Sequence, residues 1–115
     1  MAVLSSHLLN GVDGTHAGEV TVTLIQIAAD GERSVVFEEQ SDQGGRFQQD
    51  VAVVTDAGYE MVIASDAYFS GRDIPVTGTQ ILHEIVIRFS MPDPDARYHI
   101  PVIMSPNSYS CWWSS

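Results

Sequence analysis

The stretch that decides the fold is YHIPVIMSPNSYSCWWSS, which runs from Tyr98 to Ser115. An apolar run, a Ser-Pro-Asn-Ser break at 105–108 and a second run containing a tyrosine predict two strands joined by a tight turn. Trp112 and Trp113 follow, whereas a terminus that frays in water would be polar. We therefore expect this segment to be built into an interface or a pocket.

The preceding residues repeat the pattern of short strands and turns, with little helical periodicity. Apolar residues alternate with threonine from Val20 to Leu24, which predicts a half-buried strand that continues to Ile27. Asp30-Gly31 predicts a hairpin turn. We predict an all-β fold, an antiparallel β-sandwich of seven to eight strands with one short helix. Its other elements are strands at 34–37, 59–65 and 81–89, the last being the longest, and a helical turn at 66–71, in one domain over residues 1–115.

Charge and composition exclude several classes of partner and chemistry. The 115 residues carry a formal net charge of −10 and contain no lysine. No basic cluster is present to neutralise phosphates, so we expect no nucleic-acid partner, and the acidic surface disfavours anionic membranes. The absence of lysine excludes Schiff-base chemistry on a lysine amine. An anionic substrate would therefore need a local arginine or histidine pocket.

The single cysteine and the chain's ends carry three further expectations. Cys111 cannot form an intrachain disulfide. The N-terminus lacks the cationic and long apolar regions of a signal peptide, and no run approaches transmembrane length, so we expect a cytoplasmic protein without a membrane partner. The last strand would be an unprotected sheet edge, which predicts an oligomer. The alternative is that Trp112 and Trp113 fold back onto their own sandwich.

Three residues are candidates for chemistry. His99 lies in an otherwise apolar run, where desolvation favours the neutral imidazole that a general base needs. Arg46 follows two glycines, which let the backbone turn sharply and aim the guanidinium at a carbonyl that develops negative charge. His7 lies on the first strand, opposite in direction to Leu8. Taken singly, the ordinary explanations are a structural histidine in both cases and a solvated loop arginine.

Other candidates are weaker. His16 lies in a turn, His83 shares a face with isoleucines and is expected to be structural, and Cys111 has no adjacent base or cation to activate a thiol. No His, Cys, Asp or Glu residues have zinc spacing, and there is no nucleophile elbow, phosphate loop or dinucleotide fingerprint. We therefore expect neither a metal nor a cofactor.

Motifs along nearly the whole chain resemble the transthyretin-like 5-hydroxyisourate hydrolase family. Residues 4–10 (LSSHLLN) are similar to that family's opening L-[ST]-x-H-V-L-D, and residues 14–18 to G-x-P-A-x-G, with His16 where proline is usual. Residues 41–46 resemble T-N-x-D-G-R and keep the final Gly45-Arg46 pair. The closing segment keeps most of Y-H-[VI]-P, S-P and Y-S-T-Y-R-G-S.

The resemblance implies a transthyretin-like sandwich, assembled as a homotetramer around a central channel. It also implies hydrolysis of the cyclic amide of 5-hydroxyisourate, a small planar heterocycle formed by urate oxidation, without a cofactor. His7, Arg46, His99 and Ser115 match the family's site positions. A neutral histidine would activate water, the second histidine would orient that water or protonate the leaving nitrogen, and Arg46 would stabilise the oxyanion.

The closing signature departs from the family pattern at Trp112, Trp113 and Ser114, where tyrosine, arginine and glycine are usual. By alternation Ser110, Trp112 and Ser114 share a face, and by resemblance that face lines the channel. We therefore expect Ser110, Trp112 and Ser115 to contact substrate, with the Trp112 indole as a stacking surface. Three functions stay open: 5-hydroxyisourate hydrolysis, opening of a different cyclic amide, imide or imine, and non-catalytic binding of a planar ligand, as in transthyretin.

Overall fold

Alternation along the first strand explains how the fold is built. β1 (Ala2–Asn10) buries Leu4 and Leu8 completely, whereas Ser5 and His7 between them are partly exposed. Because successive side chains of a strand point to opposite faces, one face of β1 packs into the core and the other faces outward.

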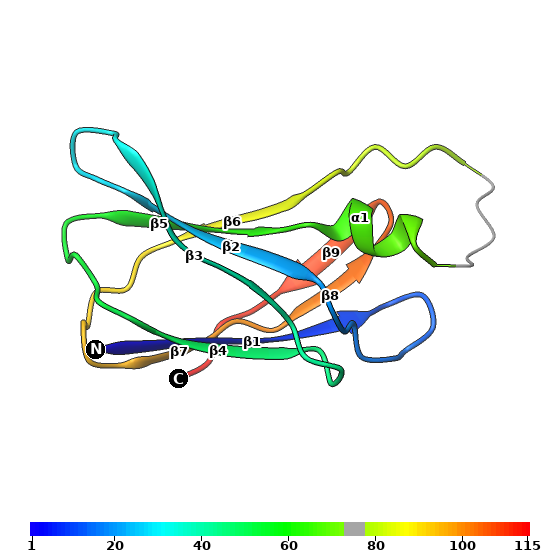
Figure 1. The fold of residues 1–115 in the computed structure, drawn as a ribbon, viewed down its shortest axis with the longest axis horizontal. Coiled ribbons are helices and arrows are strands. Elements are labelled where there is room, and N and C mark those ends of the chain that lie inside the picture. The colour runs from blue at the N-terminus through cyan, green and yellow to red at the C-terminus, as the bar shows by residue number, and fades with distance from the viewer. Residues whose placement is uncertain (73–77) are drawn as a thin grey trace.

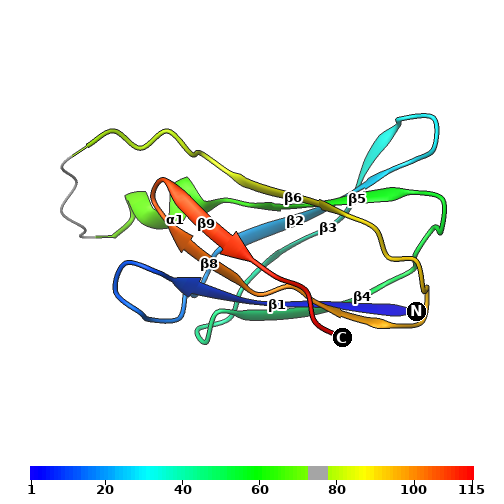
Figure 2. The same ribbon diagram turned by 180° about the vertical axis from the view of Figure 1, so that it is seen from behind.

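The computed structural model, which describes residues 1–72 and 78–115, has two sheets stacked as layers (Figures 1 and 2). The helix α1 (Ser65–Ser70) follows the second sheet's central strand β5. The first sheet has the order β4 (Arg46–Val51), β1, β8 (Val102–Ser105), β9 (Ser108–Cys111), with β7 (Arg97–His99) also pairing with β1. The second has the order β3 (Arg33–Gln40), β2 (Thr21–Ile27), β5 (Gly58–Ile63), β6 (Ile85–Phe89).

The predicted all-β sandwich with one short helix is confirmed, and two details differ. The described residues contain nine strands where seven to eight were expected, because Ile100-Pro101 interrupts the C-terminal run and divides it into β7 and β8. The sandwich is otherwise antiparallel, but β1 runs parallel to both β7 and β8. The two ends of the chain therefore lie side by side in the first sheet.

The strand expected over 81–89 is shorter than predicted. β6 begins only at Ile85, and the longest strand is β1 with nine residues. The Ile81 side chain is exposed, and its backbone N–H donates to Asn107 Oδ1 at 2.7 Å. His83 is also exposed, and its Nδ1 lies 3.0 Å from Asp66 Oδ2. The residues from 81 to 84 therefore form a connection before β6 that side-chain contacts hold in place.

The predicted C-terminal hairpin is present. Ser105 pairs with Ser108 across a two-residue turn, and β9 forms the free edge of the first sheet (Figure 2). Val102 and Met104 of β8 are completely buried, whereas Ile103 between them faces outward. The hairpin thus continues both faces of β1: an inner face in the core and an outer face that carries the candidate site.

Candidate active site

His7 and Arg46 lie directly opposite each other in the β1–β4 ladder. Both point to the outer face, because their strand neighbours Leu8 and Phe47 are buried in the core. Side chains opposite each other in an antiparallel pair have Cβ atoms about 4.5–5.5 Å apart. The ladder register therefore places an imidazole beside a guanidinium.

The loop before β4 aims Arg46 through its backbone. Asp42 Oδ1 accepts hydrogen bonds from the N–H groups of Gly44 and Arg46, each at 2.9 Å. Gly45 has φ of 78°, and its carbonyl accepts a bond from Leu8 N–H at 2.6 Å. A Cβ on Gly45 would lie 2.3 Å from the Leu8 carbonyl oxygen, so only glycine fits this approach.

His99 joins the same face from β7. It pairs with Ser5 in the parallel β1–β7 ladder, two residues before His7 on the outer face of β1. Ser5 Oγ lies 2.9 Å from His99 Nδ1. On its other side, the His99 backbone exchanges two hydrogen bonds with Ser114, at 3.0 and 2.8 Å. The imidazole is thus held between the first strand and the last residues of the chain.

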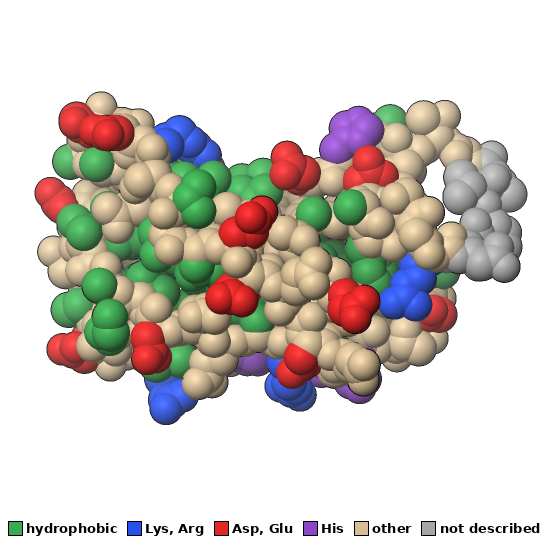
Figure 3. Space-filling model, viewed as in Figure 1, with side chains coloured by type: hydrophobic (Ala, Val, Ile, Leu, Met, Phe, Trp, Pro, Cys, Tyr) green, Lys and Arg blue, Asp and Glu red, His purple; other side chains and the backbone are tan. Residues whose placement is uncertain are grey.

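A cavity of about 220 Å³ lies on this face, and its lining residues include Arg46, His99, Ser5 and Gln48. His7 stands beside it, opposite Arg46. In Figure 3, histidine and arginine side chains gather along the lower edge of the molecule, below the first sheet. This basic patch on an otherwise acidic protein suits a substrate that develops negative charge.

The electrostatics of the patch favour a neutral His7. Burial, followed by the positive charge of Arg46 and the neighbouring His16, lowers the pKa of His7 below its ordinary value of 6.5. His99 acts in the same direction, whereas a hydrogen bond to the Gly44 backbone opposes the shift. His7 is therefore uncharged near neutral pH.

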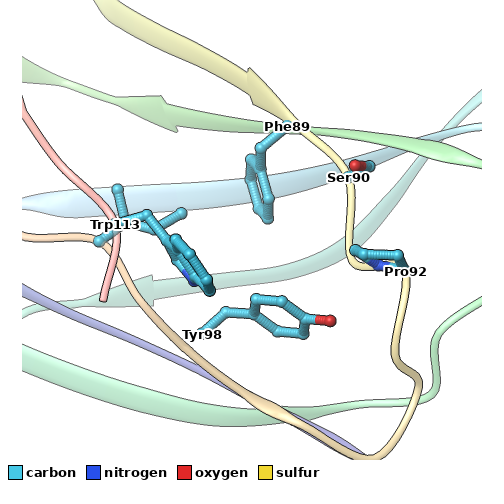
Figure 4. Close-up of a pocket in the computed structure, with 6 residues that line it drawn as sticks. Phe89, Ser90, Pro92, Tyr98 and Trp113 are labelled. Atoms are coloured by element: carbon cyan, nitrogen blue, oxygen red, sulfur yellow. The ribbon is translucent and has the colours of Figure 1, made fainter. Parts of the chain in front are cut away.

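The two tryptophans separate onto opposite faces. Ser110 pairs with outward-facing Ile103, so alternation places Trp112 on the outer face with it. Trp113 points to the other side and lines an apolar cavity of about 250 Å³ with Phe89 and Tyr98 (Figure 4), although 61% of it stays exposed. Both tryptophans stay exposed, so the alternative that they fold back onto their own sandwich applies only to the side of Trp113 that borders this cavity.

Trp112 is 48% exposed on the face that carries the imidazoles, and a tryptophan so exposed is available to a ligand or a partner. Ser115 is exposed and follows Ser114, the residue that pairs with His99. Ser110 is also exposed, on the edge strand β9. The predicted substrate-binding residues thus lie along one border of the first sheet.

Sequence reasoning undervalued two residues. Ser5 contacts His99, a pairing that depends on the parallel alignment of β1 and β7. His16 Nδ1 lies 2.8 Å from His7 Nε2, and the two rings stack with centroids 4.9 Å apart. The sequence contained one sign of this contact: His16 stands where the motif of the transthyretin-like hydrolases has proline.

The other two weaker candidates, Cys111 and His83, stay outside this site. Cys111 is a free, exposed thiol on β9, and His83 is bonded to Asp66. In the described part of the chain, no group of three His, Cys, Asp or Glu side chains is arranged to hold a metal ion. Within residues 1–72 and 78–115 there is also no helix with the length and apolarity needed to cross a membrane.

Comparison with known proteins places the chain in a family. The model of the HIUase/Transthyretin family matches residues 4–113, which is nearly the entire sequence. The chain belongs to this family. The resemblance expected from the motifs at 4–10, 41–46 and the closing segment is thereby confirmed.

Relatives of this family member include enzymes and solved structures. The 5-hydroxyisourate hydrolase of Caulobacter vibrioides is 30% identical over 120 residues, covering 100% of both chains. The structure of Klebsiella pneumoniae 5-hydroxyisourate hydrolase has a TM-score of 0.74 at 25% identity, covering 98% of this chain and 99% of that one. A crystal structure of (S)-allantoin synthase matches 99% of this chain with a TM-score of 0.84 and 25% identity. The matched region is 44% of the synthase chain.

Proposed function

We propose that this family member is a cofactor-independent hydrolase that opens a cyclic amide, with 5-hydroxyisourate as the first substrate to test. The observation that carries the proposal is the shared outer face of β1, β4 and β7, where Arg46 and His99 line a cavity of about 220 Å³ and His7 lies opposite Arg46. The relatives named 5-hydroxyisourate hydrolase, which match the full length of the chain, support this substrate and hence a role in purine breakdown.

His99 is the proposed general base because it lines the cavity. When its Nδ1–H donates to Ser5 Oγ, the lone pair is on Nε2 and available to a water molecule. His99 Nε2 takes a proton from that water as the oxygen attacks the carbonyl carbon of the cyclic amide. The resulting imidazolium returns the proton to the ring nitrogen when the carbon–nitrogen bond breaks, which yields a carboxylic acid and a free amine.

Arg46 is the proposed electrostatic element. The carbonyl oxygen of the substrate becomes an oxyanion in the tetrahedral intermediate, and a fixed guanidinium next to it stabilises that charge without reorganisation. The loop at 41–46 fixes the backbone of Arg46 before substrate binds. Neutral His7 beside it adds no competing positive charge and is free to hydrogen-bond to the substrate or the water.

Trp112 favours a second candidate within the same chemistry, a different cyclic amide, imide or imine. An exposed indole on the outer face offers a broad stacking surface and one N–H donor, where the family signature has a tyrosine hydroxyl. A flatter or more apolar ring would gain from this exchange. Non-catalytic binding of a planar ligand would use the same indole and leave His99 without a chemical role.

A homotetramer around a channel is part of the proposal. All four residues of the edge strand β9 are exposed, and the outer face carries Trp112 and Ile103, both at least partly open to solvent. Pairing of sheet edges and burial of this face between subunits would cover both. We also propose a cytoplasmic location, because an exposed free cysteine suits a reducing compartment.

The direct test uses purified protein and freshly generated 5-hydroxyisourate, followed by the decay of its ultraviolet absorbance. Acceleration above the spontaneous rate, lost in His99→Ala and Arg46→Ala and kept in the remote variant His83→Ala, supports the hydrolase. A rate equal to the spontaneous one rejects this substrate. Activity on another cyclic amide that depends on His99 then supports the second candidate, whereas ligand binding that survives His99→Ala supports a binder.

A further inference from the structure

A second imidazole is bound to His7 in this chain. His7 Nε2 and His16 Nδ1 are 2.8 Å apart, within hydrogen-bond distance, and the rings lie nearly parallel with an interplanar angle of 26°. Two ring nitrogens cannot approach this closely with their lone pairs facing each other, so a proton lies between them.

The segment that carries His16 is rigidly placed. The chain folds back after β1, so that His16 lies opposite Leu9 in an antiparallel bridge. Two backbone bonds flank this pair, from Asn10 N–H to the Thr15 carbonyl at 2.8 Å and from Ala17 N–H to the Leu8 carbonyl at 2.9 Å. Leu9 and His16 are therefore a non-hydrogen-bonded pair, whose side chains lie close together. As a diagonal neighbour across this bridge, the His16 side chain shares the outer face with His7.

The groups around His7 favour one tautomer. The Gly44 backbone acts to raise the pKa of His7, which is the effect of a carbonyl that faces a ring N–H. Because Nε2 is engaged with His16, the Gly44 carbonyl is left with Nδ1–H. With the proton on Nδ1 of His7, Nε2 is unprotonated, and the 2.8 Å contact is then a hydrogen bond that His16 Nδ1–H donates. His16 thus supplies the donor that matches this tautomer.

We propose that His16 is a positioning residue for His7: its imidazole fixes the tautomer and the ring orientation of His7. This inference rests on the proposed hydrolase, in which His7 acts beside Arg46. The proline that is usual at this position in the family motif has no side-chain donor and could not play this part.

The charged groups that face His7 disfavour its protonation. Arg46 of β4 and His99 of β7 face His7 and lower its pKa, as does His16 itself. Around His16, a separate depression brings together Glu19, Gln43 and Arg72. Removing the His16 ring takes away a donor to neutral His7, a neighbouring positive charge and part of its burial. Each of these losses raises the pKa of His7, so the predicted direction is unambiguous.

The test is a pH titration of the histidine ring nitrogens by ¹⁵N NMR, which needs no substrate. His7→Gln assigns the His7 signals. The titrations are then compared for the unchanged protein, His16→Ala, His16→Asn and the control His83→Ala, which removes an exposed histidine bonded to Asp66 on the connection before β6. His16→Pro is a further variant, because a proline in the non-hydrogen-bonded pair loses no ladder bond.

The expected result is an upward shift of the His7 titration midpoint in His16→Ala and His16→Pro, and an unchanged midpoint in His83→Ala. His16→Asn keeps a side-chain N–H donor and should restore the Nδ1–H tautomer signature of His7. The acid limb of the kcat/KM profile should move to higher pH in step. An unchanged His7 midpoint and tautomer in all the His16 variants overturns the proposal. Absence of turnover in the unchanged protein instead refutes the hydrolase, while the NMR result still decides the role of His16.

Discussion

Replacing Gly45 by alanine tests how the site is built. Gly45 has φ of 78°, and an added Cβ would lie 2.3 Å from the Leu8 carbonyl oxygen and 3.1 Å from the Ala17 nitrogen. The left-handed conformation costs alanine about 1–2 kcal/mol. Both contacts are backbone atoms, so they cannot rotate away, and forcing them apart adds about 1–3 kcal/mol, as overpacking does in a core.

Gly31 provides the matched control. It also has positive φ, 90°, but no atom lies within 4 Å of the position of an added Cβ. Gly31→Ala therefore carries only the conformational cost of about 1–2 kcal/mol. The two variants should therefore differ in unfolding free energy by about 1–3 kcal/mol. This difference measures the cost of the close contact between the loop at 41–46 and β1.

Urea unfolding measures this difference. With a denaturant slope of about 1–3 kcal/mol per M, Gly45→Ala should unfold at a urea concentration lower than that of Gly31→Ala by roughly 1 M. Equal protomer concentrations are needed, because assembly stabilises the folded state by mass action. Since Arg46 follows Gly45, turnover should fall in Gly45→Ala and persist in Gly31→Ala. Equal midpoints for the two variants would refute the geometric reasoning.

Three other predictions follow from the site and the second sheet. His99→Ala should lower kcat by about 10²–10⁴-fold with assembly intact by size-exclusion chromatography, and Ser5→Ala should lower it less; unchanged turnover in both contradicts the assignment of the base. Trp112→Tyr, which restores the family residue, should raise kcat/KM for 5-hydroxyisourate relative to flatter substrates, and an unchanged ratio removes Trp112 from the specificity determinants. Hydrogen bonds from Arg33 and Arg88 hold the pKa of Glu60 below its ordinary value of 4.5, so the unfolded chain binds this proton at a higher pH than the folded protein does. The stability that Glu60 contributes is thus present above pH 4.5 and is lost as the pH falls through the lower pKa of the folded state. In that pH range the unfolding free energy of the unchanged protein should approach that of Glu60→Gln. A difference in unfolding free energy that does not change with pH contradicts the ion-pair explanation.

Much of the fold could be predicted from local patterns, because period-two alternation and turn residues are local signals. They located β2, the turn at Gly31 and the C-terminal hairpin. Strand order is a property of the whole chain, so the parallel pairing of β1 with β7 and β8 was not predictable in this way. The strand over 81–89 was overestimated because an alternating pattern does not reveal whether a pairing strand is available.

The candidate site shows the same division. Motif resemblance identified His7, Arg46 and His99, and the structure places them on one face, although their chemical roles stay predictions. Alternation puts Trp112 on the outer face with Ser110, whereas its neighbour Trp113 borders the apolar cavity. The contact between His7 and His16 depends on how a loop folds back, and no periodic pattern encodes that path.

The parallel pairing of the first strand also constrains how the protein comes into being. Ser5 and His99, which touch in the finished molecule, are 94 positions apart. On a ribosome, β1 emerges first and must wait for nearly all of the remaining polypeptide before its neighbours β7 and β8 exist. Contacts between such distant positions slow folding and prolong the exposure of unpaired strands to other molecules. A nascent chain that stalls before residue 97 would therefore hold His7 and Arg46 but lack His99, and the cavity would be missing one of its walls.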